Sequence, residues 1–168
     1  MKLGREFFRR DVLEVAPDLL GKYIILKKGR GTLAYRITEV EAYRGEEDLA
    51  CHASKGRTPR TDVMYQDGGT IYVYLIYGIH YLLNFVTENT EVPQAALIRG
   101  VENVVGPGRV SKLLQIDKDF NREDLITSKR IWVEDRGDKK PKYSTAKRIG
   151  IDYAKEWKDK LWRFIISN

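Results

Sequence analysis

The amino-acid sequence predicts an antiparallel α+β fold, or a mostly-β one. Many short apolar runs have the character of strands, and few helical patterns separate them, which favours antiparallel pairing. The chain has 168 residues, within the usual range of one domain, so we expect a single domain over residues 1–168. Hydrophobic residues make up 42% and charged residues 32%, a balance typical of a packed core rather than of disorder.

The first third of the chain predicts a helical segment followed by a β-hairpin. Apolar residues recur with roughly helical spacing over residues 5–15, and residues 18–21 resemble a last helical turn that stops at a glycine. Residues 22–28 are rich in isoleucine and leucine and predict a strand. A Gly-Arg-Gly turn at 29–31 then leads into a partner strand over residues 32–43.

A long irregular segment comes next. Residues 44–69 contain four glycines, a proline and many charges, which predicts a loop, and long loops inside compact domains commonly carry function. Residues 70–77 and 79–87 are apolar and aromatic. They predict two strands joined by a tight turn at Tyr77 and Gly78.

The remainder of the chain predicts one more helix among short strands. Residues 95–101 predict a strand. The tripeptide at 106–108 is Gly-Pro-Gly, which predicts the start of a helix that continues to about Ile116, because proline is favoured at the first helical position. Short β-like runs at 130–134 and 162–166 complete the pattern.

Charge and rare residues narrow the function. The net charge of +6 suggests an anionic partner, nucleic acid before membrane, or simply a basic surface. One cysteine, Cys51, excludes an internal disulfide, and two histidines without a C-x-x-C pair argue against structural zinc and zinc deaminases. No apolar run is long enough to span a membrane, and the first residues lack a signal-peptide core. We therefore expect a soluble protein of the cytoplasm, beside the nucleoid, or of the nucleus.

Residues 37–43 end a predicted strand with acidic and aromatic side chains. A period of two places Glu39, Glu41 and Tyr43 on one face of that strand, just before the long loop. Two acids and a tyrosine in this position could form a site for acid–base chemistry. The alternative is a solvent-facing strand edge, where glutamate is ordinary.

Other polar and aromatic residues lie on the strands that follow the loop. Tyr72 and Tyr74 share a face that could stack nucleic-acid bases or pack across strands. Tyr77 occupies the tip of the tight turn, where an exposed aromatic ring could act as a wedge in DNA. Asn84 and Arg99 lie among apolar residues and need polar partners, either as structural groups or as parts of a site.

Taken together, these segments resemble a known family. The shared strings are Thr38-Glu39-Val40-Glu41-Ala42-Tyr43, Ala50-Cys51-His52-Ala53, Gly56-Arg57-Thr58-Pro59-Arg60, Val63-Met64-Tyr65, Tyr72-Val73-Tyr74-Leu75-Ile76-Tyr77-Gly78, Asn84, Leu97-Ile98-Arg99 and Gly106-Pro107-Gly108. In this order they resemble the alkyladenine (methylpurine) family of 3-methyladenine DNA glycosylases over nearly the whole chain. Thr61 and Gly100 depart from the family pattern beside the matched strings.

The resemblance implies a fold and an activity. It implies a single mixed α/β domain on a curved antiparallel sheet with flanking helices, like the C-terminal domain of methionyl-tRNA formyltransferases. It also implies a monomer that removes alkylated or deaminated purines from double-stranded DNA with no metal and no cofactor. The substrates implied are 3-methyladenine, 7-methylguanine, hypoxanthine and ethenoadenine, which the sequence does not rank. A non-catalytic nucleic-acid-binding module of related fold is the alternative, and it has no need of Glu41 with Arg99.

The resemblance also implies roles for individual residues. Glu41 resembles the carboxylate that activates water, and Arg99 the group that helps to hold that water, while Glu39 is assigned a supporting role. Tyr43, His52 and Tyr74 resemble the pocket that holds the damaged base. Asn84 resembles the residue that excludes normal guanine, and Tyr77 resembles the wedge that enters the DNA. The matched pocket strings contain no lysine nucleophile, so we expect hydrolysis that leaves an abasic site.

Basic residues outside the pocket are candidates for DNA-backbone contacts. They are Arg57, Arg60, Arg109 and Lys112, with Lys55 beside them. The helix that begins near Gly106 could also present backbone N–H groups to a phosphate. Contacts of this kind make binding strongly dependent on salt. For any one of these residues, plain solvation at the surface is the alternative.

Overall fold

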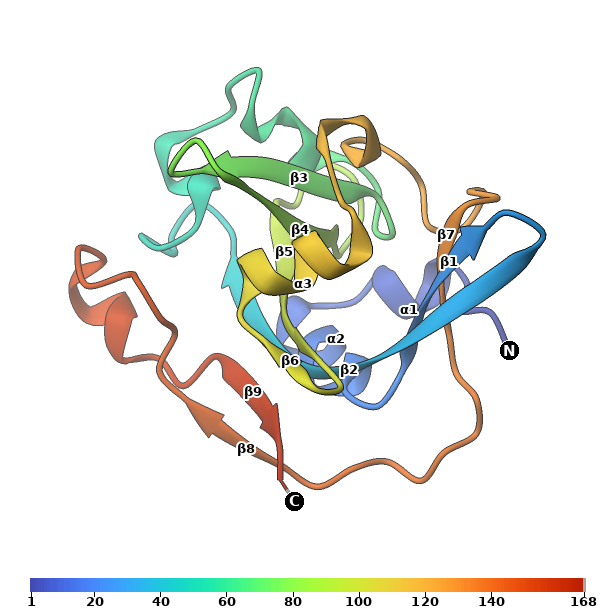
Figure 1. Cartoon of the computed structure of the whole chain (residues 1–168). Helices are drawn as coiled ribbons and strands as arrows, with labels where there is room; N and C mark the ends of the chain where they lie inside the picture. The colour runs from blue at the N-terminus through green and yellow to red at the C-terminus, as the bar shows by residue number, and fades with distance from the viewer. Residues whose placement is uncertain (168) are drawn as a thin grey trace.

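The computed structural model describes residues 1–167 and confirms the antiparallel α+β fold (Figure 1). Its strands are β1 (Tyr23–Lys28), β2 (Gly31–Arg44), β3 (Ile71–Ile76), β4 (His80–Val86), β5 (Gln94–Val101), β6 (Val104–Val105), β7 (Ile131–Glu134), β8 (Tyr143–Ala146) and β9 (Arg163–Ile166). Its helices are α1 (Arg5–Phe8), α2 (Val12–Leu19) and α3 (Pro107–Leu114), with short 3-10 turns η1 (His52–Lys55), η2 (Thr61–Tyr65), η3 (Lys118–Phe120) and η4 (Lys155–Asp159).

Within residues 1–167, nine strands form one sheet in which every pairing is antiparallel. The main path runs β3-β4-β5-β2-β1-β7; β6 pairs with β5, and β9 pairs with both β2 and β8. The long strand β2 connects the two halves, because its first part pairs with β1 and its second part with β5 and β9. The register of β2 against β5 shifts on both sides of Glu39, and such a bulge bends a strand and redirects its side chains.

Helix α2 closes the hydrophobic core against β2 and β5. The prediction of one helix over residues 5–15 is wrong, because the chain forms α1 and α2 with a break at residues 9–11. The carboxylate of Asp11 accepts a hydrogen bond from the Leu13 N–H at 2.8 Å and caps a new helix there. Val12, Val15, Ala16 and Leu19 of α2 then face the core with no exposed surface.

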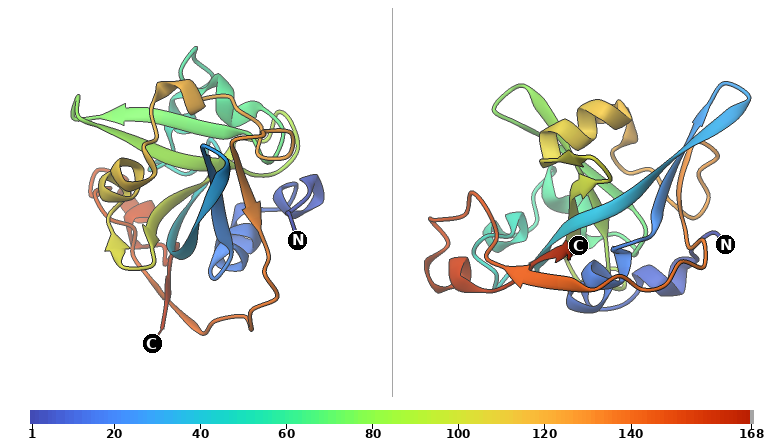
Figure 2. Two further views of the ribbon diagram at one scale, coloured as in Figure 1. Left: turned by 45° about the vertical axis from the view of Figure 1, so that its right-hand side comes forward. Right: turned by 60° about the horizontal axis from the view of Figure 1, so that its bottom comes forward.

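Strands β3 and β4 form the hairpin expected around the tight turn. The Ile79 N–H donates to the Ile76 carbonyl at 3.1 Å and closes a turn centred on Tyr77 and Gly78, which take left-handed φ values of 53° and 65°. The hairpin projects beyond the body of the molecule (Figure 2). Strands β6 and β8 were not predicted: β6 has two residues, and β8 reads Tyr-Ser-Thr-Ala with no alternation of apolar and polar residues.

The carboxyl-terminal part of the chain returns to the far end of β2. A strap of residues 135–142 carries the chain from β7 around the molecule to β8 (Figure 1). The buried Arg148 then donates hydrogen bonds to both carboxylate oxygens of Asp48 at 2.6 and 3.0 Å, and one to the Ala42 carbonyl at 3.0 Å. These bonds hold residues 148–153 over the end of β2. In residues 1–167 we find no helix long and apolar enough to cross a membrane.

Candidate active site

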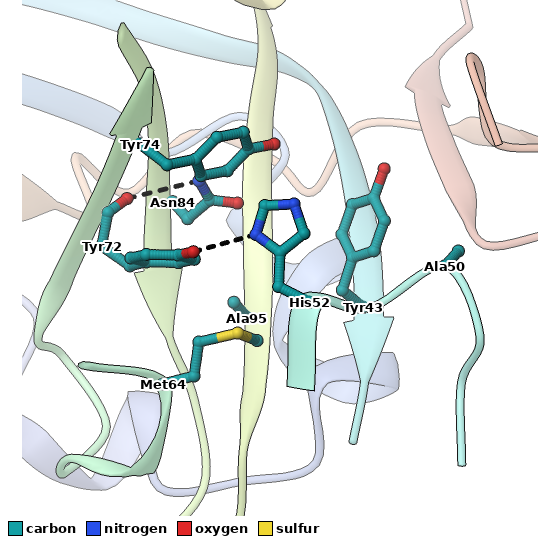
Figure 3. Close-up of a pocket in the computed structure, with 8 residues that line it drawn as sticks. All are labelled: Tyr43, Ala50, His52, Met64, Tyr72, Tyr74, Asn84 and Ala95. Carbon is teal, nitrogen blue, oxygen red and sulfur yellow. Dashed lines mark hydrogen bonds between the residues drawn. The ribbon is translucent and has the colours of Figure 1, made fainter. Parts of the chain in front are cut away.

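An open cavity of about 370 Å³ lies where β2, β3, β5, η1 and residues 149–153 meet. This volume is in the range of small-molecule sites. The cavity wall contains six of the seven residues expected in the pocket or wedge, namely Glu41, Tyr43, His52, Tyr74, Tyr77 and Arg99. The seventh, Asn84, lines an adjoining recess of about 20 Å³ (Figure 3). A recess of that size holds about one water molecule, so a purine base has to occupy the larger cavity or displace side chains.

Glu41 is fully buried in the cavity wall, with each carboxylate oxygen already holding one partner. Oε1 accepts a hydrogen bond from the Tyr43 hydroxyl at 2.9 Å, and Oε2 accepts one from the Ile149 N–H at 2.7 Å. Burial raises the pKa of Glu41, while Arg99 and the two hydrogen bonds oppose that rise. Each carboxylate oxygen has a second lone pair, so Glu41 can still accept a hydrogen bond from water.

Arg99 lies between two carboxylates of β2. Its Nε donates to Glu39 Oε2 at 2.7 Å, while its Nη1 is 3.7 Å from Glu41 Oε1. The second distance is too long for a direct hydrogen bond, so Arg99 acts on Glu41 through its charge. Arg163 Nη1 also approaches Glu39 Oε2, at 3.7 Å. Arg99 therefore bonds to Glu39 first, which gives Glu39 a defined partner, and it faces Glu41 across a gap.

Aromatic rings line the cavity on two sides. His52 packs edge to face against Tyr74 with ring centroids 4.5 Å apart, and its Nδ1 lies 2.9 Å from the Tyr72 hydroxyl. In Figure 3, His52 stands between these tyrosines and Tyr43. Burial, with help from the nearby cations Arg60 and Lys55, lowers the pKa of His52 to about 4. At neutral pH the imidazole is uncharged, so it can donate from one nitrogen and accept at the other.

Asn84 is held at the floor of the recess. Its Nδ2 donates long hydrogen bonds to the carbonyl oxygens of Tyr72 at 3.3 Å and Leu82 at 3.4 Å. Both acceptors belong to the backbone of the β3–β4 hairpin. The amide group is therefore fixed by the hairpin, and among residues 1–167 its oxygen has no hydrogen-bond partner (Figure 3).

The tip of the β3–β4 hairpin exposes two apolar side chains. Tyr77 is 84% exposed and Ile79 is 71% exposed, on either side of Gly78. Tyr77 also lines the cavity, so the tip lies at its mouth. Sequence reasoning identified Tyr77 and missed Ile79, although an isoleucine directly after a turn glycine indicates an exposed apolar side chain.

The basic residues expected to contact DNA lie in three different environments. Arg57 already pairs with Asp62 at 2.8 Å and with Glu91 at 2.5 Å, so a phosphate would have to compete for it. Arg60 stacks over the Tyr74 ring at 5.3 Å and lines the cavity. Arg109 and Lys112 are exposed on α3 and, within residues 1–167, pair with no carboxylate.

The carboxyl-terminal segment contributes a wall that sequence reasoning missed. Ile149, Gly150, Ile151 and Tyr153 line the cavity, and Ile149 supplies a hydrogen bond to Glu41. No pattern in this segment pointed to β2, which lies over 100 residues away in the sequence.

Among the described residues, no group of three or more histidine, cysteine, aspartate or glutamate side chains could hold a metal ion.

Comparison with known proteins gives one consistent result. The family model for methylpurine-DNA glycosylase matches residues 6–106 and 103–168. Proteins from Natranaerobius thermophilus, Legionella pneumophila (strain Lens) and Rickettsia felis, each named "Putative 3-methyladenine DNA glycosylase", are 42%, 45% and 47% identical to the chain. The alignments cover 100%, 99% and 99% of this chain and 96%, 95% and 93% of the three relatives.

The fold, the cavity and these matches define an enzyme of DNA repair, a DNA glycosylase. The chain belongs to the methylpurine-DNA glycosylase family. The resemblance seen in the sequence is thereby confirmed over the full length of the chain.

Proposed function

We propose that this enzyme hydrolyses the N-glycosidic bond of alkylated or deaminated purines in double-stranded DNA and leaves an abasic site. The names of the relatives give 3-methyladenine as the first substrate to test. The observation that carries the proposal is the fully buried Glu41 in the wall of an aromatic cavity. A buried carboxylate costs free energy and repels phosphates, so a protein that only binds DNA gains nothing from it.

Extrusion of the nucleotide comes first, because the target bond is inaccessible inside a duplex. Unpairing and unstacking cost a few kcal/mol. Tyr77 and Ile79 at the hairpin tip are placed to fill the gap that the extruded nucleotide leaves in the stack. The base then enters the cavity between Tyr43 and the pair formed by His52 and Tyr74, where aromatic faces replace the lost stacking. A cationic lesion gains a further cation–π attraction.

Bond cleavage then places positive charge on the sugar. As in glycoside hydrolysis, the transition state resembles an oxocarbenium ion, which an ionised carboxylate stabilises. Glu41 serves this role and accepts a proton from a water molecule in the cavity, which Arg99 in the same wall helps to hold. In the described part of the chain, no lysine lines the cavity, which supports hydrolysis without a covalent amine intermediate.

Asn84 supplies selectivity in this scheme. Two hydrogen bonds hold its amide at the floor of the recess, so it cannot move aside and would clash with the 2-amino group of an undamaged guanine. All the proposed site residues come from one copy of the chain, so we further propose that the enzyme acts as a monomer.

The test is base release from duplexes that contain 3-methyladenine or hypoxanthine, for the wild type and for Glu41→Gln. Loss of a general base costs about 10²–10⁴-fold in rate, so release by the variant should fall by at least about 100-fold. Binding to a duplex with an unreactive tetrahydrofuran abasic analogue should stay close to that of the wild type.

Two outcomes would contradict the proposal. If Glu41→Gln releases bases at the wild-type rate, Glu41 is not the group that activates water. If neither protein releases any lesion while both bind the duplex equally, hydrolysis is the wrong activity. A panel with 7-methylguanine and ethenoadenine, measured on the same duplex, then ranks the substrates.

A further inference from the structure

The tip of the β1–β2 hairpin has a dense and unbalanced positive charge. Residues 19–38 contain five lysines and arginines and no acidic residue. Three of these cations, Lys27, Lys28 and Arg30, lie at the tip and are exposed. Within residues 1–167, none of the three pairs with a carboxylate, whereas Lys22 at the base of the hairpin pairs with Asp135 at 3.1 Å. Like charges so close together repel one another, which is a cost that the fold alone does not require.

A chain of contacts connects this tip to the mouth of the cavity. Lys28 Nζ donates a hydrogen bond to Gln115 Oε1, and Gln115 is the residue that ends α3. At its other end, α3 begins with Pro107, which lines the cavity. Lys112, between these ends, lines a hollow of about 320 Å³ with Ile79 of the β3–β4 hairpin.

The two hairpins therefore flank α3. Figure 2 (right) shows both projecting on the same side of the molecule, with α3 between them. At a rise of about 1.5 Å per residue, the eight residues of α3 span roughly 12 Å from the cavity to Gln115. At about 3.4 Å per base pair, this distance corresponds to three or four base pairs of DNA.

We propose that the β1–β2 hairpin tip binds the sugar-phosphate backbone of the substrate duplex, three or four base pairs to one side of the extruded nucleotide. These groups suit a polyanion, because the Lys28 ammonium is a compact cationic donor and the Arg30 guanidinium a forked one. Within residues 1–167 neither pairs with a carboxylate that a phosphate would have to displace. The contact is additional to Arg109 and Lys112, and it makes the grip on DNA asymmetric about the lesion. It rests on the proposed function.

The first measurement is the salt dependence of binding. The probe is a duplex with a tetrahydrofuran abasic analogue and long flanks, titrated with enzyme between about 50 and 200 mM salt. Each lost phosphate contact lowers the slope of log K against log[salt] by about 1, so Lys28→Ala/Arg30→Ala should lower it by about 2. Affinity at 0.1 M salt should fall by about tenfold or more. The control is Lys139→Ala/Lys142→Ala, which removes the same charge from two exposed positions on the strap.

The second measurement locates the contact. Duplexes are shortened to two base pairs on one side of the analogue or on the other. The wild type should lose affinity more on one shortening than on the other, and Lys28→Ala/Arg30→Ala should remove that difference.

The outcomes separate this proposal from the proposed function. If Lys28→Ala/Arg30→Ala keeps the slope of the wild type or matches the control, the hairpin does not bind the duplex, and base release by the wild type is unaffected by that conclusion. If the variant loses affinity equally on both shortened duplexes, the asymmetric contact is wrong. If the wild type neither prefers the abasic analogue over undamaged DNA nor releases a base, the proposed function and this contact both fail.

Discussion

Glu39 and Glu41 lie two positions apart on β2, and Arg99 separates their charges. Arg99 bonds directly to Glu39 at 2.7 Å and remains 3.7 Å from Glu41. Glu39 thus holds the Arg99 guanidinium in place and neutralises part of its positive charge. The charged and titratable groups near Glu41 include Tyr43 from its own strand, Tyr74 from β3, Arg99 from β5 and Arg148 from the carboxyl-terminal segment. The pKa of Glu41 depends on this balance.

Neutralising Glu39 should shift the pH dependence of base release. Burial raises the pKa of Glu41, and the rate falls as pH drops through that pKa because Glu41 acts in its ionised form. In Glu39→Gln a nearby negative charge is lost and the charge of Arg99 is left to Glu41, so both effects lower the pKa of Glu41. The acid limb of the single-turnover rate on a hypoxanthine duplex should therefore move to lower pH.

Glu102→Gln is the matched control for this variant, because it removes the same charge from an exposed position. Its pH profile should overlay that of the wild type. A Glu39→Gln protein that melts at a lower temperature but keeps the wild-type acid limb would show that Glu39 only supports the fold.

At the level of elements, the β3–β4 hairpin combines a strained turn with exposed apolar groups. Tyr77→Ala should weaken binding to the tetrahydrofuran duplex by about 5- to 150-fold, the value of one stacked base, because the ring fills the vacated stack. The side chain is mostly in solvent, so the melting temperature should stay near that of the wild type.

Tyr143→Ala removes another exposed tyrosine, from β8, and should bind the duplex as the wild type does. Equal affinity and equal rates for Tyr77→Ala and the wild type would remove the wedge from the mechanism.

Elements bounded by strong local signals could be predicted from sequence. The glycines at 29 and 31 and the Tyr77-Gly78 pair marked both hairpins, and the period of two placed Glu41 and Tyr43 on one face of β2. The break between α1 and α2 was missed because apolar spacing continues across it, while the cap at Asp11 decides where the new helix starts. The partner of Arg99 was also missed, since it depends on a bulge at Glu39 that no local pattern encodes.

At the level of the whole molecule, a buried ion pair holds the carboxyl-terminal segment in place. Arg148 and Asp48 are both fully buried, and the Arg148 guanidinium also lies 5.0 Å from the Tyr43 and Trp162 ring centroids. Removing one partner of a buried pair costs about 3–5 kcal/mol, because the other charge loses its compensation. Arg148→Ala should therefore lower the melting temperature by roughly 6–20 °C.

Calorimetry or thermal unfolding followed by circular dichroism measures this shift. Lys147→Ala is the control, because Lys147 is the preceding residue and its ion pair with Asp159 is exposed, and it should melt with the wild type. An Arg148→Ala protein that also melts with the wild type would mean that the segment is held by other contacts.

The hydrogen bond from Ile149 to Glu41 also affects when a newly made molecule becomes active. A ribosome that has synthesised the first 140 residues has already produced Glu41, Arg99, Tyr43, Tyr74 and Tyr77, but not Tyr153 of the cavity wall. It has not yet produced the N–H that binds Glu41 Oε2, nor the arginine that fixes this N–H in position. The nascent chain can thus build most of the sheet during translation, but its cavity gains its last wall only after residues 149–153 emerge. A stop codon between positions 140 and 148 would therefore give a chain with every proposed pocket side chain and an unfinished site.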